Sequence, residues 1–407
     1  MPHEKMARSK ALLARAERLI PGASQTNSKR PRRDCLDQVP AFIERGEGCH
    51  VWDVDGHEYV DYIMALGPIL LGYRHPAVEE AVREAMDLGV VFGLPHPLEV
   101  DAAEAVVRTV PCAEQVRFLK SGAEATSAAV RIARACTGRE VVLSCGYHGW
   151  HDNWTAMRND GGVPHCLEDL VHSFPYNSTD ALKSALEEYK GKVAAVIMVP
   201  AQVEHPKENY LQTAASLARD AGALLVFDEI VTGFRLALGG GQERFQVVPD
   251  LAAFAKGMAN GYPIAAVVGR SEYMERAEEL LITTTYGGEI HSLAALKGCV
   301  QFLESNPPYE GMARLGEELM RGTKDAARSS GVDAELIGFE VMPQLIIRGG
   351  SSERTSNMWR VFLGEAAQRG VLLREGGLLF ITPSHTEEDI ERTICAFEAA
   401  FQAADKA

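Results

Sequence analysis

Short, uninterrupted apolar runs alternate with helical stretches from about Val116 onward, and this alternation constrains the fold more than any other feature. Runs that are apolar throughout, without a polar residue at every second position, are typical of parallel strands buried on both faces. Residues 123–137 and 208–221 between them have helical composition, and Gly138 and Gly222 follow as helix stops. The pattern predicts an α/β fold with a mostly parallel, doubly wound sheet. The expected strands are residues 116–119, 141–145, 193–199, 223–227, 251–255 and 265–269.

Two of these runs end on residues with chemistry of their own. The run at 223–227 leads directly into Asp228. The run at 251–255 leads directly into Lys256, and the turn residues 260–263 follow soon after. Ligands of α/β folds bind at the carboxyl ends of such strands. Apolar neighbours desolvate Lys256 in part, which lowers the pKa of its amine and favours imine formation. A carboxylate and a Schiff-base lysine are what a protein contributes to pyridoxal-phosphate chemistry.

Composition excludes several other classes of protein. A chain of 407 residues is long enough for one large domain and a smaller one. The net charge of −15 argues against nucleic acid as a partner, because such surfaces are basic. No run reaches the roughly 18 apolar residues of a membrane span, so no membrane partner is expected. Residues 1–18 are charged throughout, which predicts an amphipathic helix rather than a secretory signal and favours a cytoplasmic location.

No metal site is predicted from the sequence. The cysteines are scattered without a C-x-x-C pair, and in a chain of this kind they are expected to be reduced and to act as small apolar fillers. His148 and His151 have H-x-x-H spacing, but the further ligands that a metal needs are not apparent. The eight cysteines are Cys35, Cys49, Cys112, Cys136, Cys145, Cys166, Cys299 and Cys395.

The flanks of the alternating region differ from it. Residues 49–62 are expected to form a hairpin, because two apolar stretches surround Asp55-Gly56, a strong hairpin signal. The segment from about residue 307 carries helices and strands with glycine-pair turns at 349–350 and 376–377.

Five motifs together resemble the class III, fold-type I aminotransferases, especially the branch near glutamate-1-semialdehyde aminomutase. They are F-D-E-I-V-T-G-F-R at 227–235, A-K-G-M-A-N-G-Y-P at 255–263, S-G-A-E-A at 121–125, G-Y-H-G-W at 146–150 and T-Y-G-G at 285–288. The resemblance implies a large pyridoxal-phosphate-binding domain over residues 61–305. It also implies a small α+β domain built from residues 1–60 and 306–407, and a homodimer with shared active sites.

The resemblance also implies which residues hold the cofactor ring. Asp228 faces the pyridine nitrogen, where a carboxylate favours the protonated ring, the better electron sink. Lys256 forms the Schiff base and can shuttle a proton. Tyr147 stacks on one face of the ring and Ile230 packs on the other.

The phosphate is expected at the start of the helix that follows the first strand. Ser121, Gly122 and Ala123 offer a hydroxyl, free backbone N–H groups and the positive end of the helix dipole. A serine at this place is also an ordinary N-cap, so Ser121 has two possible roles. By the resemblance, Thr285 reaches the phosphate of the neighbouring subunit.

The remaining expectations concern the reaction and its substrate. We expect an aminotransferase that moves an amino group between an amino acid and a keto or aldehyde acceptor of secondary or sugar metabolism. There are two alternatives: an isomerase of the aminomutase or epimerase type, and a non-catalytic pyridoxal-phosphate-binding protein. Many class III members have glutamine at the position of Val231, and the apolar residue here favours the aminomutase branch. Lys29 or Arg30 is the candidate for holding a substrate carboxylate, although the segment can also be a solvated basic loop, and Trp150 is a candidate for the substrate pocket.

Overall fold

The computed structural model describes residues 6–158 and 161–407 and divides the chain into two compact units. Unit 1 comprises residues 1–75 and 310–407, and unit 2 comprises residues 76–309. The first boundary lies later than the one expected after residue 60, because residues 62–75 are tied into unit 1. The Tyr73 backbone N–H donates to Gly48 O at 2.7 Å, and the Tyr73 hydroxyl donates to Asp61 at 2.8 Å.

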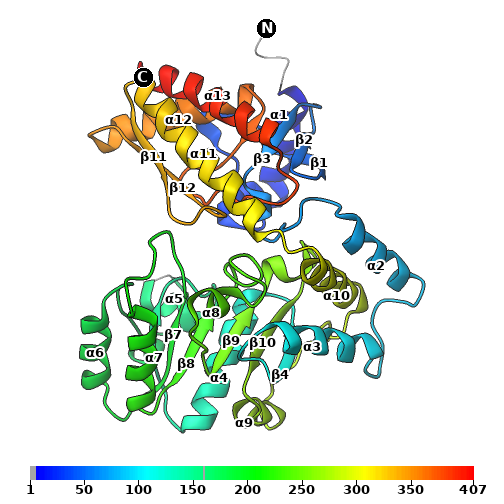
Figure 1. Ribbon diagram of the computed structural model, residues 1–407, viewed down its shortest axis with the longest axis vertical. Coiled ribbons are helices and arrows are strands. Elements are labelled where there is room, and N and C mark those ends of the chain that lie inside the picture. Colours follow the sequence, from blue (N-terminus) through cyan, green and yellow to red (C-terminus); the bar gives the residue numbers. More distant parts are fainter. Residues whose placement is uncertain (1–5, 159–160) are drawn as a thin grey trace. The chain divides into compact units, whose positions relative to one another are not determined.

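A seven-stranded sheet in the order β4-β10-β9-β8-β7-β5-β6 forms the centre of unit 2 (Figure 1). All six expected strands are present, and the expectation of an α/β fold with a mostly parallel sheet is confirmed. The short edge strand β6 was not expected, and β10 runs antiparallel to both of its neighbours. The strands are β4 (Gln115–Leu119), β5 (Val141–Cys145), β6 (Val171–Ser173), β7 (Val193–Met198), β8 (Leu224–Asp228), β9 (Leu251–Phe254) and β10 (Ala265–Gly269).

Helices complete unit 2. Small residues of α4 pack with alternate residues of the strands, such as Ala195 and Ile197, which point to one face of the sheet. Helix α7 packs against strand β8, and helix α6 packs against α7 (Figure 1). The helices are α2 (Pro76–Met86), α3 (Pro97–Thr109), α4 (Gly122–Thr137), α5 (Asp152–Thr155), α6 (Thr179–Glu188), α7 (Tyr210–Asp220), α8 (Gly240–Phe245), α9 (Ser271–Met274) and α10 (Ile290–Ser305).

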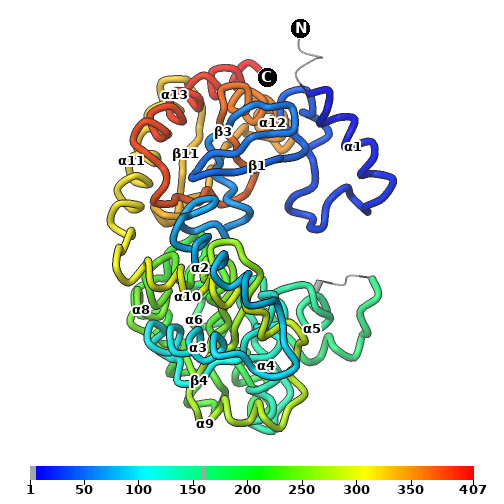
Figure 2. Tube along the Cα trace, turned by 90° about the vertical axis from the view of Figure 1, so that its right-hand side faces the viewer, coloured from blue at the N-terminus to red at the C-terminus, as the bar shows by residue number. Residues whose placement is uncertain are grey.

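Unit 1 joins an amino-terminal and a carboxyl-terminal segment in one sheet, of order β1-β2-β3-β13. Figure 2 shows the blue strands β1 and β3 of this unit together with its orange and red carboxyl-terminal segments. The predicted hairpin is β2 and β3, and β13 from the carboxyl-terminal part pairs in parallel with β3. Phe362 packs against Phe397 and Phe401, with ring centroids 5.1 and 4.8 Å apart, and this contact holds helix α12 on α13. The elements are α1 (Ala7–Leu19), β1 (Ile43–Glu47), β2 (His50–Asp53), β3 (Glu58–Asp61), α11 (Tyr309–Ser329), β11 (Asp333–Ile337), β12 (Gln344–Arg348), α12 (Ser352–Gln368), β13 (Val371–Leu372) and α13 (Glu387–Ala404).

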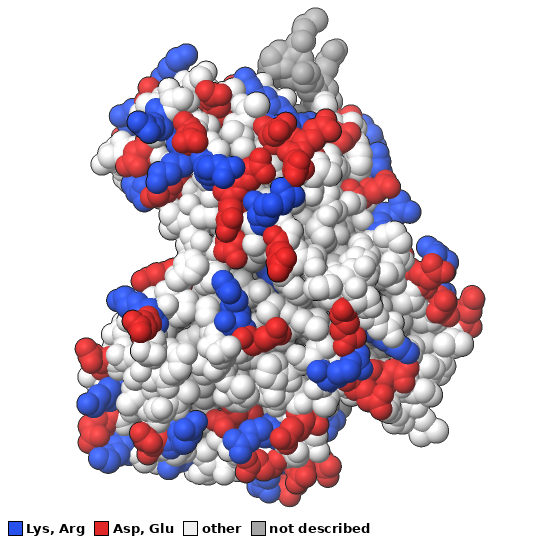
Figure 3. Space-filling model, viewed as in Figure 1, with Lys and Arg blue, Asp and Glu red and all other residues white. Residues whose placement is uncertain are grey.

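Charged side chains of both signs lie on the surface, and the cysteines differ in how deeply they are buried. Acidic and basic side chains are interspersed over each unit on the face shown in Figure 3. Among the described residues, no helix combines the length and the apolar character that a membrane crossing requires. All eight cysteines are free and five are buried, but Cys166 and Cys395 are exposed, so these two are not apolar fillers.

Candidate active site

Asp228 and Lys256 lie at the same edge of the sheet of unit 2. Asp228 is the last residue of β8 and pairs with Ala253 of the adjacent parallel strand β9. Lys256 follows the end of β9 and begins the 3-10 helix Lys256–Ala259. Because β8 and β9 run in the same direction, their carboxyl ends carry both functional groups to one edge.

The backbone and the surroundings of Lys256 are both unusual. Its φ of +48° lies in the left-handed region, which costs a residue other than glycine on the order of 1–3 kcal/mol and is most frequent at functional sites. Burial lowers the pKa of the Lys256 amine; the Asp228 carboxylate opposes this shift and the Arg235 guanidinium adds to it. Lys256 is therefore a partly buried lysine whose neutral, nucleophilic form is favoured.

His148 holds the Asp228 carboxylate in place. Its Nδ1 lies 2.7 Å from Asp228 Oδ2, and because a carboxylate can only accept, Nδ1 carries the hydrogen. The backbone N–H of Ile230 donates to the other oxygen at 3.0 Å. Asp228 is 3% exposed and His148 is 4% exposed, so this is a buried, charge-assisted hydrogen bond.

From the sequence, His148 is only one half of an H-x-x-H pair, and its contact with Asp228 was not predicted. His148 and Asp228 are 80 residues apart in the chain, and no local pattern connects them. The position of His148 in the motif directly after β5 was the available signal, since β5 and β8 both end at the same edge of the sheet.

The amino terminus of α4 presents the residues expected to bind phosphate. Ser121 forms a capping box with Glu124: its Oγ accepts from Glu124 N at 3.3 Å, and Glu124 Oε2 accepts from Ser121 N at 2.7 Å. Gly122 and Ala123 are the first helical residues, whose N–H groups have no acceptor within the helix. A Cβ on Gly122 would lie 2.9 Å from Ile230 Cδ1, so Ile230 packs directly at this helix start.

The loop that carries Tyr147 and Trp150 is docked on the first turn of α4. Gly149 has a φ of +127°, and a Cβ there would lie 2.6 Å from Ala123 Cβ. Thr126 Oγ1 donates to the His148 carbonyl oxygen at 2.6 Å. Tyr147 is 63% exposed and Trp150 is 71% exposed, so this loop presents two large aromatic side chains to solvent beside Asp228 and the helix start.

Thr285 lies exposed in the loop that precedes α10. The end of this loop is tied to the segment before α4, because Glu289 forms an ion pair with Lys120 at 3.0 Å. Glu289 also caps α10 by accepting from the backbone N–H of His291 and Ser292.

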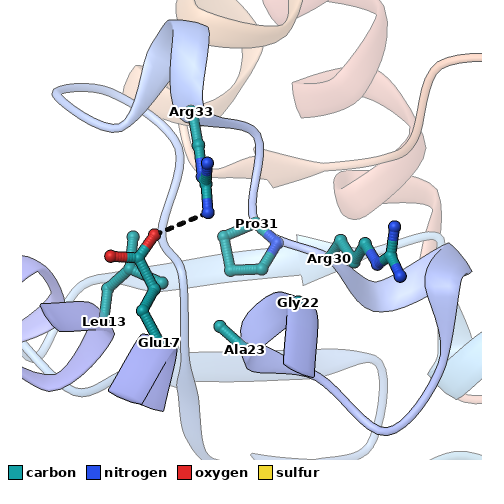
Figure 4. A pocket seen from close by; sticks show the side chains of 7 residues that line it. All are labelled: Leu13, Glu17, Gly22, Ala23, Arg30, Pro31 and Arg33. Atoms are coloured by element: carbon teal, nitrogen blue, oxygen red, sulfur yellow. Dashed lines mark ion pairs between the residues drawn. The ribbon is translucent and has the colours of Figure 1, made fainter. Parts of the chain in front are cut away.

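Lys29 and Arg30 belong to unit 1. Both are exposed and line a cavity of about 620 Å³ with Arg374, Tyr73 and apolar side chains. Arg30 also lines a smaller cavity of about 200 Å³, where Arg33 and Glu17 form an ion pair at 2.8 Å (Figure 4).

Comparisons with known proteins agree with this arrangement. The family model described as "Aminotransferase class-III" matches residues 34–401. The chain is 33% identical to a 3-aminobutyryl-CoA aminotransferase of Cloacimonas acidaminovorans, over 96% of this chain and 95% of the relative. It is 34% identical to a glutamate-1-semialdehyde 2,1-aminomutase of Desulfatibacillum aliphaticivorans, over 97% of this chain and 99% of the relative.

Solved structures show the same fold. The FumI protein of Sphingopyxis sp. MTA144, in its internal aldimine form with pyridoxal phosphate, superposes with a TM-score of 0.92 at 29% identity, over 98% of this chain and 97% of that one. An omega-transaminase from Sphaerobacter thermophilus superposes with a TM-score of 0.90 at 25% identity, over 98% of both chains.

The residues present fit pyridoxal phosphate. Lys256 offers an amine of lowered pKa, Asp228 offers a buried carboxylate with fixed orientation, and the start of α4 offers N–H groups for an anion. The close approach of Ile230 to Gly122 leaves no room for a side chain there, and the helix start is accessible at the exposed Ser121. The chain therefore belongs to the class-III aminotransferases, and it is a pyridoxal-phosphate-dependent aminotransferase.

Proposed function

We propose that Lys256 holds the cofactor through a Schiff base and that Asp228 pairs with its ring nitrogen. One observation carries this proposal: Lys256 and Asp228 stand at the carboxyl ends of two adjacent parallel strands, and His148 fixes the direction of the Asp228 carboxylate. When bound, the cofactor supplies an electron sink for the carbon that bears the amino group.

The protein's own residues do the remaining work. Lys256, once its amine is free, is the group at the site suited to take a proton from the substrate carbon and return it, because burial lowers the pKa of its amine. His148 keeps the Asp228 carboxylate pointing in one direction. Ser121, Gly122 and Ala123 bind the phosphate, while Tyr147 and Ile230 flank the ring.

The test of this proposal is covalent trapping. Borohydride treatment of the holoenzyme should fix the mass of the cofactor on the peptide that contains Lys256, and Lys256→Ala should lose both the adduct and turnover. Lys297→Ala is the matched control, because Lys297 pairs with Asp101 on α3 and should leave both unchanged. An adduct on Lys120, the lysine next to the phosphate site, would contradict the assignment.

We propose an amino acid as the donor and a keto or aldehyde compound as the acceptor. The relatives named as aminotransferases and transaminases support this reaction, and the relatives named as aminomutases make an isomerase the second candidate. The two differ in stoichiometry. A transaminase given donor alone releases one keto product per site and keeps the amino group, whereas an aminomutase given its substrate releases an isomer and no keto acid.

Substrate contacts are proposed for Trp150, Lys29 and Arg30. Trp150 is an exposed aromatic on the loop that also carries Tyr147, and the two cations line the larger cavity of unit 1. Alanine variants should raise KM for an anionic substrate more than they lower kcat, because such contacts are made before and during the reaction alike.

We also propose a homodimer with shared sites, working in the cytoplasm. Thr285 is exposed, and so is a run of large apolar residues in unit 2, which is typical of an association surface. Eight free cysteines fit a reducing compartment. The exposed apolar residues of the run are Met86, Leu88, Val90, Val91, Phe92 and Leu94.

Subunit complementation tests the shared site. Lys256→Ala and Thr285→Ala should each be impaired, and a mixed dimer should carry one site with both lesions and one with neither. Activity should therefore return in part after subunit exchange. An active monomer, or proven exchange without recovery, would exclude a site that crosses the interface.

A further inference from the structure

Unit 1 brings together three side chains of the kinds that bind transition metals. Cys49 directly precedes strand β2, His50 is its first residue, and Asp389 lies in the first turn of α13. We propose that Cys49, His50 and Asp389 form a site for a divalent cation of the zinc class, which cross-links the amino-terminal hairpin to the carboxyl-terminal helix. This inference does not rest on the proposed function, since the catalytic residues all belong to unit 2.

The distances between the ligand atoms suit a single ion. Cys49 Sγ lies 3.3 Å from Asp389 Oδ2, His50 Nε2 lies 3.2 Å from Asp389 Oδ1, and the three ligand atoms lie within 4.8 Å of one another. Bond lengths to zinc of about 2.3 Å for sulfur and about 2.0–2.2 Å for nitrogen and oxygen place tetrahedral ligands roughly 3.2–3.6 Å apart. Small adjustments of side chains therefore suffice to admit the ion.

A second layer of contacts orients the ligands. The other ring nitrogen of His50, Nδ1, has no hydrogen-bond partner among the described residues but lies 2.9 Å from Glu58 Oε1, close to the carboxylate–histidine arrangement found around bound metals. Thr386 donates to Asp389 Oδ2 from its backbone N–H at 3.0 Å and from its hydroxyl at 2.8 Å. Glu58 belongs to β3 and Thr386 caps the start of α13, so regular elements hold both of these outer residues in place.

The kinds of ligand and their burial favour zinc over the hard cations. A thiol, an imidazole and a carboxylate suit zinc and its neighbours, whereas magnesium and calcium prefer oxygen ligands alone. Cys49 and Asp389 are buried, but the His50 side chain is 26% exposed and leaves a route for the ion and for a water as fourth ligand.

The same residues also make a hydrogen-bonded network without metal, in which the Cys49 thiol donates to Asp389 Oδ2 and His50 Nε2 lies within ion-pair distance of Asp389 Oδ1. The two descriptions predict different responses to zinc. A metal site binds one ion per chain and becomes more stable as zinc is added, because the ion binds the folded chain alone. A network binds no ion there, and its stability is independent of zinc.

Zinc binding to the purified holoenzyme distinguishes them. After equilibrium dialysis against zinc, elemental analysis should give one ion per chain, and X-ray absorption should show one sulfur at about 2.3 Å. Cys49→Ser and His50→Gln should each lose this ion and the zinc-dependent rise in Tm, and Glu58→Gln should weaken binding by about ten- to a hundredfold.

The double variant Cys166→Ser/Cys395→Ser is the matched control, because it removes the two exposed thiols and should keep the ion. If Cys49→Ser fails to fold, His50→Gln carries the test, since His50 lies at the edge of the cluster. Zinc absent from the wild type, zinc without a sulfur ligand, or equal zinc content in wild type and His50→Gln would each overturn the proposal and leave the hydrogen-bonded network.

Discussion

Replacing His148 tests whether the orientation of Asp228 matters for turnover. His148→Leu keeps an apolar side chain in the space but removes the Nδ1 donor that lies 2.7 Å from Asp228 Oδ2. Among the described residues, the backbone N–H of Ile230 then remains as the donor to this carboxylate. His148→Asn is the matched variant, because its amide N–H can occupy the place of Nδ1.

The expected magnitude comes from the burial and charge of the contact. A hydrogen bond to a charged group contributes about 1.5–3 kcal/mol, and both partners here are nearly completely buried. If that loss falls on the transition state, kcat drops by about ten- to a hundredfold. KM for the amino donor should change little, since His148 acts through Asp228 and is proposed to touch no substrate.

Single-turnover measurements at saturating cofactor separate chemistry from cofactor loss. We expect His148→Leu to be slow, His148→Asn to recover most of the rate, and both to keep the borohydride adduct on Lys256. A His148→Leu enzyme that turns over at the wild-type rate would refute the positioning role. Equal losses in both variants would also refute it, because the loss would then not follow the hydrogen bond.

Three further predictions follow from the structure. In a urea titration, Gly149→Ala should lower the free energy of unfolding by about 2–6 kcal/mol, because of backbone strain at φ +127° and overlap with Ala123. Gly138→Ala is the control: with φ +67° and nothing within 4 Å of an added Cβ, it should show only the part that comes from backbone strain. When cofactor is added to the apoenzyme, its trapping on Lys256 should increase with pH, with a midpoint below the ordinary lysine pKa of about 10.4. Asp228→Asn should lower that midpoint further, because the Asp228 carboxylate raises the pKa of Lys256. A midpoint that moves upward in the variant would contradict this sign. Burial raises the pKa of Asp61 to about 6, so its contribution to folding, about 3 kcal/mol, is fully present below about pH 4 and is lost as pH rises through about 6. In urea unfolding across this range, the free energy of unfolding should decline less steeply with pH in Asp61→Asn than in the wild type. Parallel curves would exclude Asp61 as the source.

Local sequence determined the strands and the two residues at the heart of the site. Most expected strands of unit 2 are continuous apolar runs, which are typical of strands covered on both faces, whereas β4 contains Arg117 and is only partly buried. Asp228 and Lys256 follow two of these runs directly, so their place at the edge of the sheet could be predicted from spacing alone. The same holds for the hairpin around Asp55-Gly56, where two residues set the turn.

Contacts between distant segments were decided by the tertiary structure alone. The pairing of His148 with Asp228 spans 80 residues, and the convergence of Cys49 on Asp389 spans 340, so neither leaves a periodic signal in the chain. The antiparallel direction of β10 depends on how the chain returns to the sheet, which its apolar composition does not encode. Periodicity reports which face of an element is buried, whereas the partner across that face is chosen only when the elements pack.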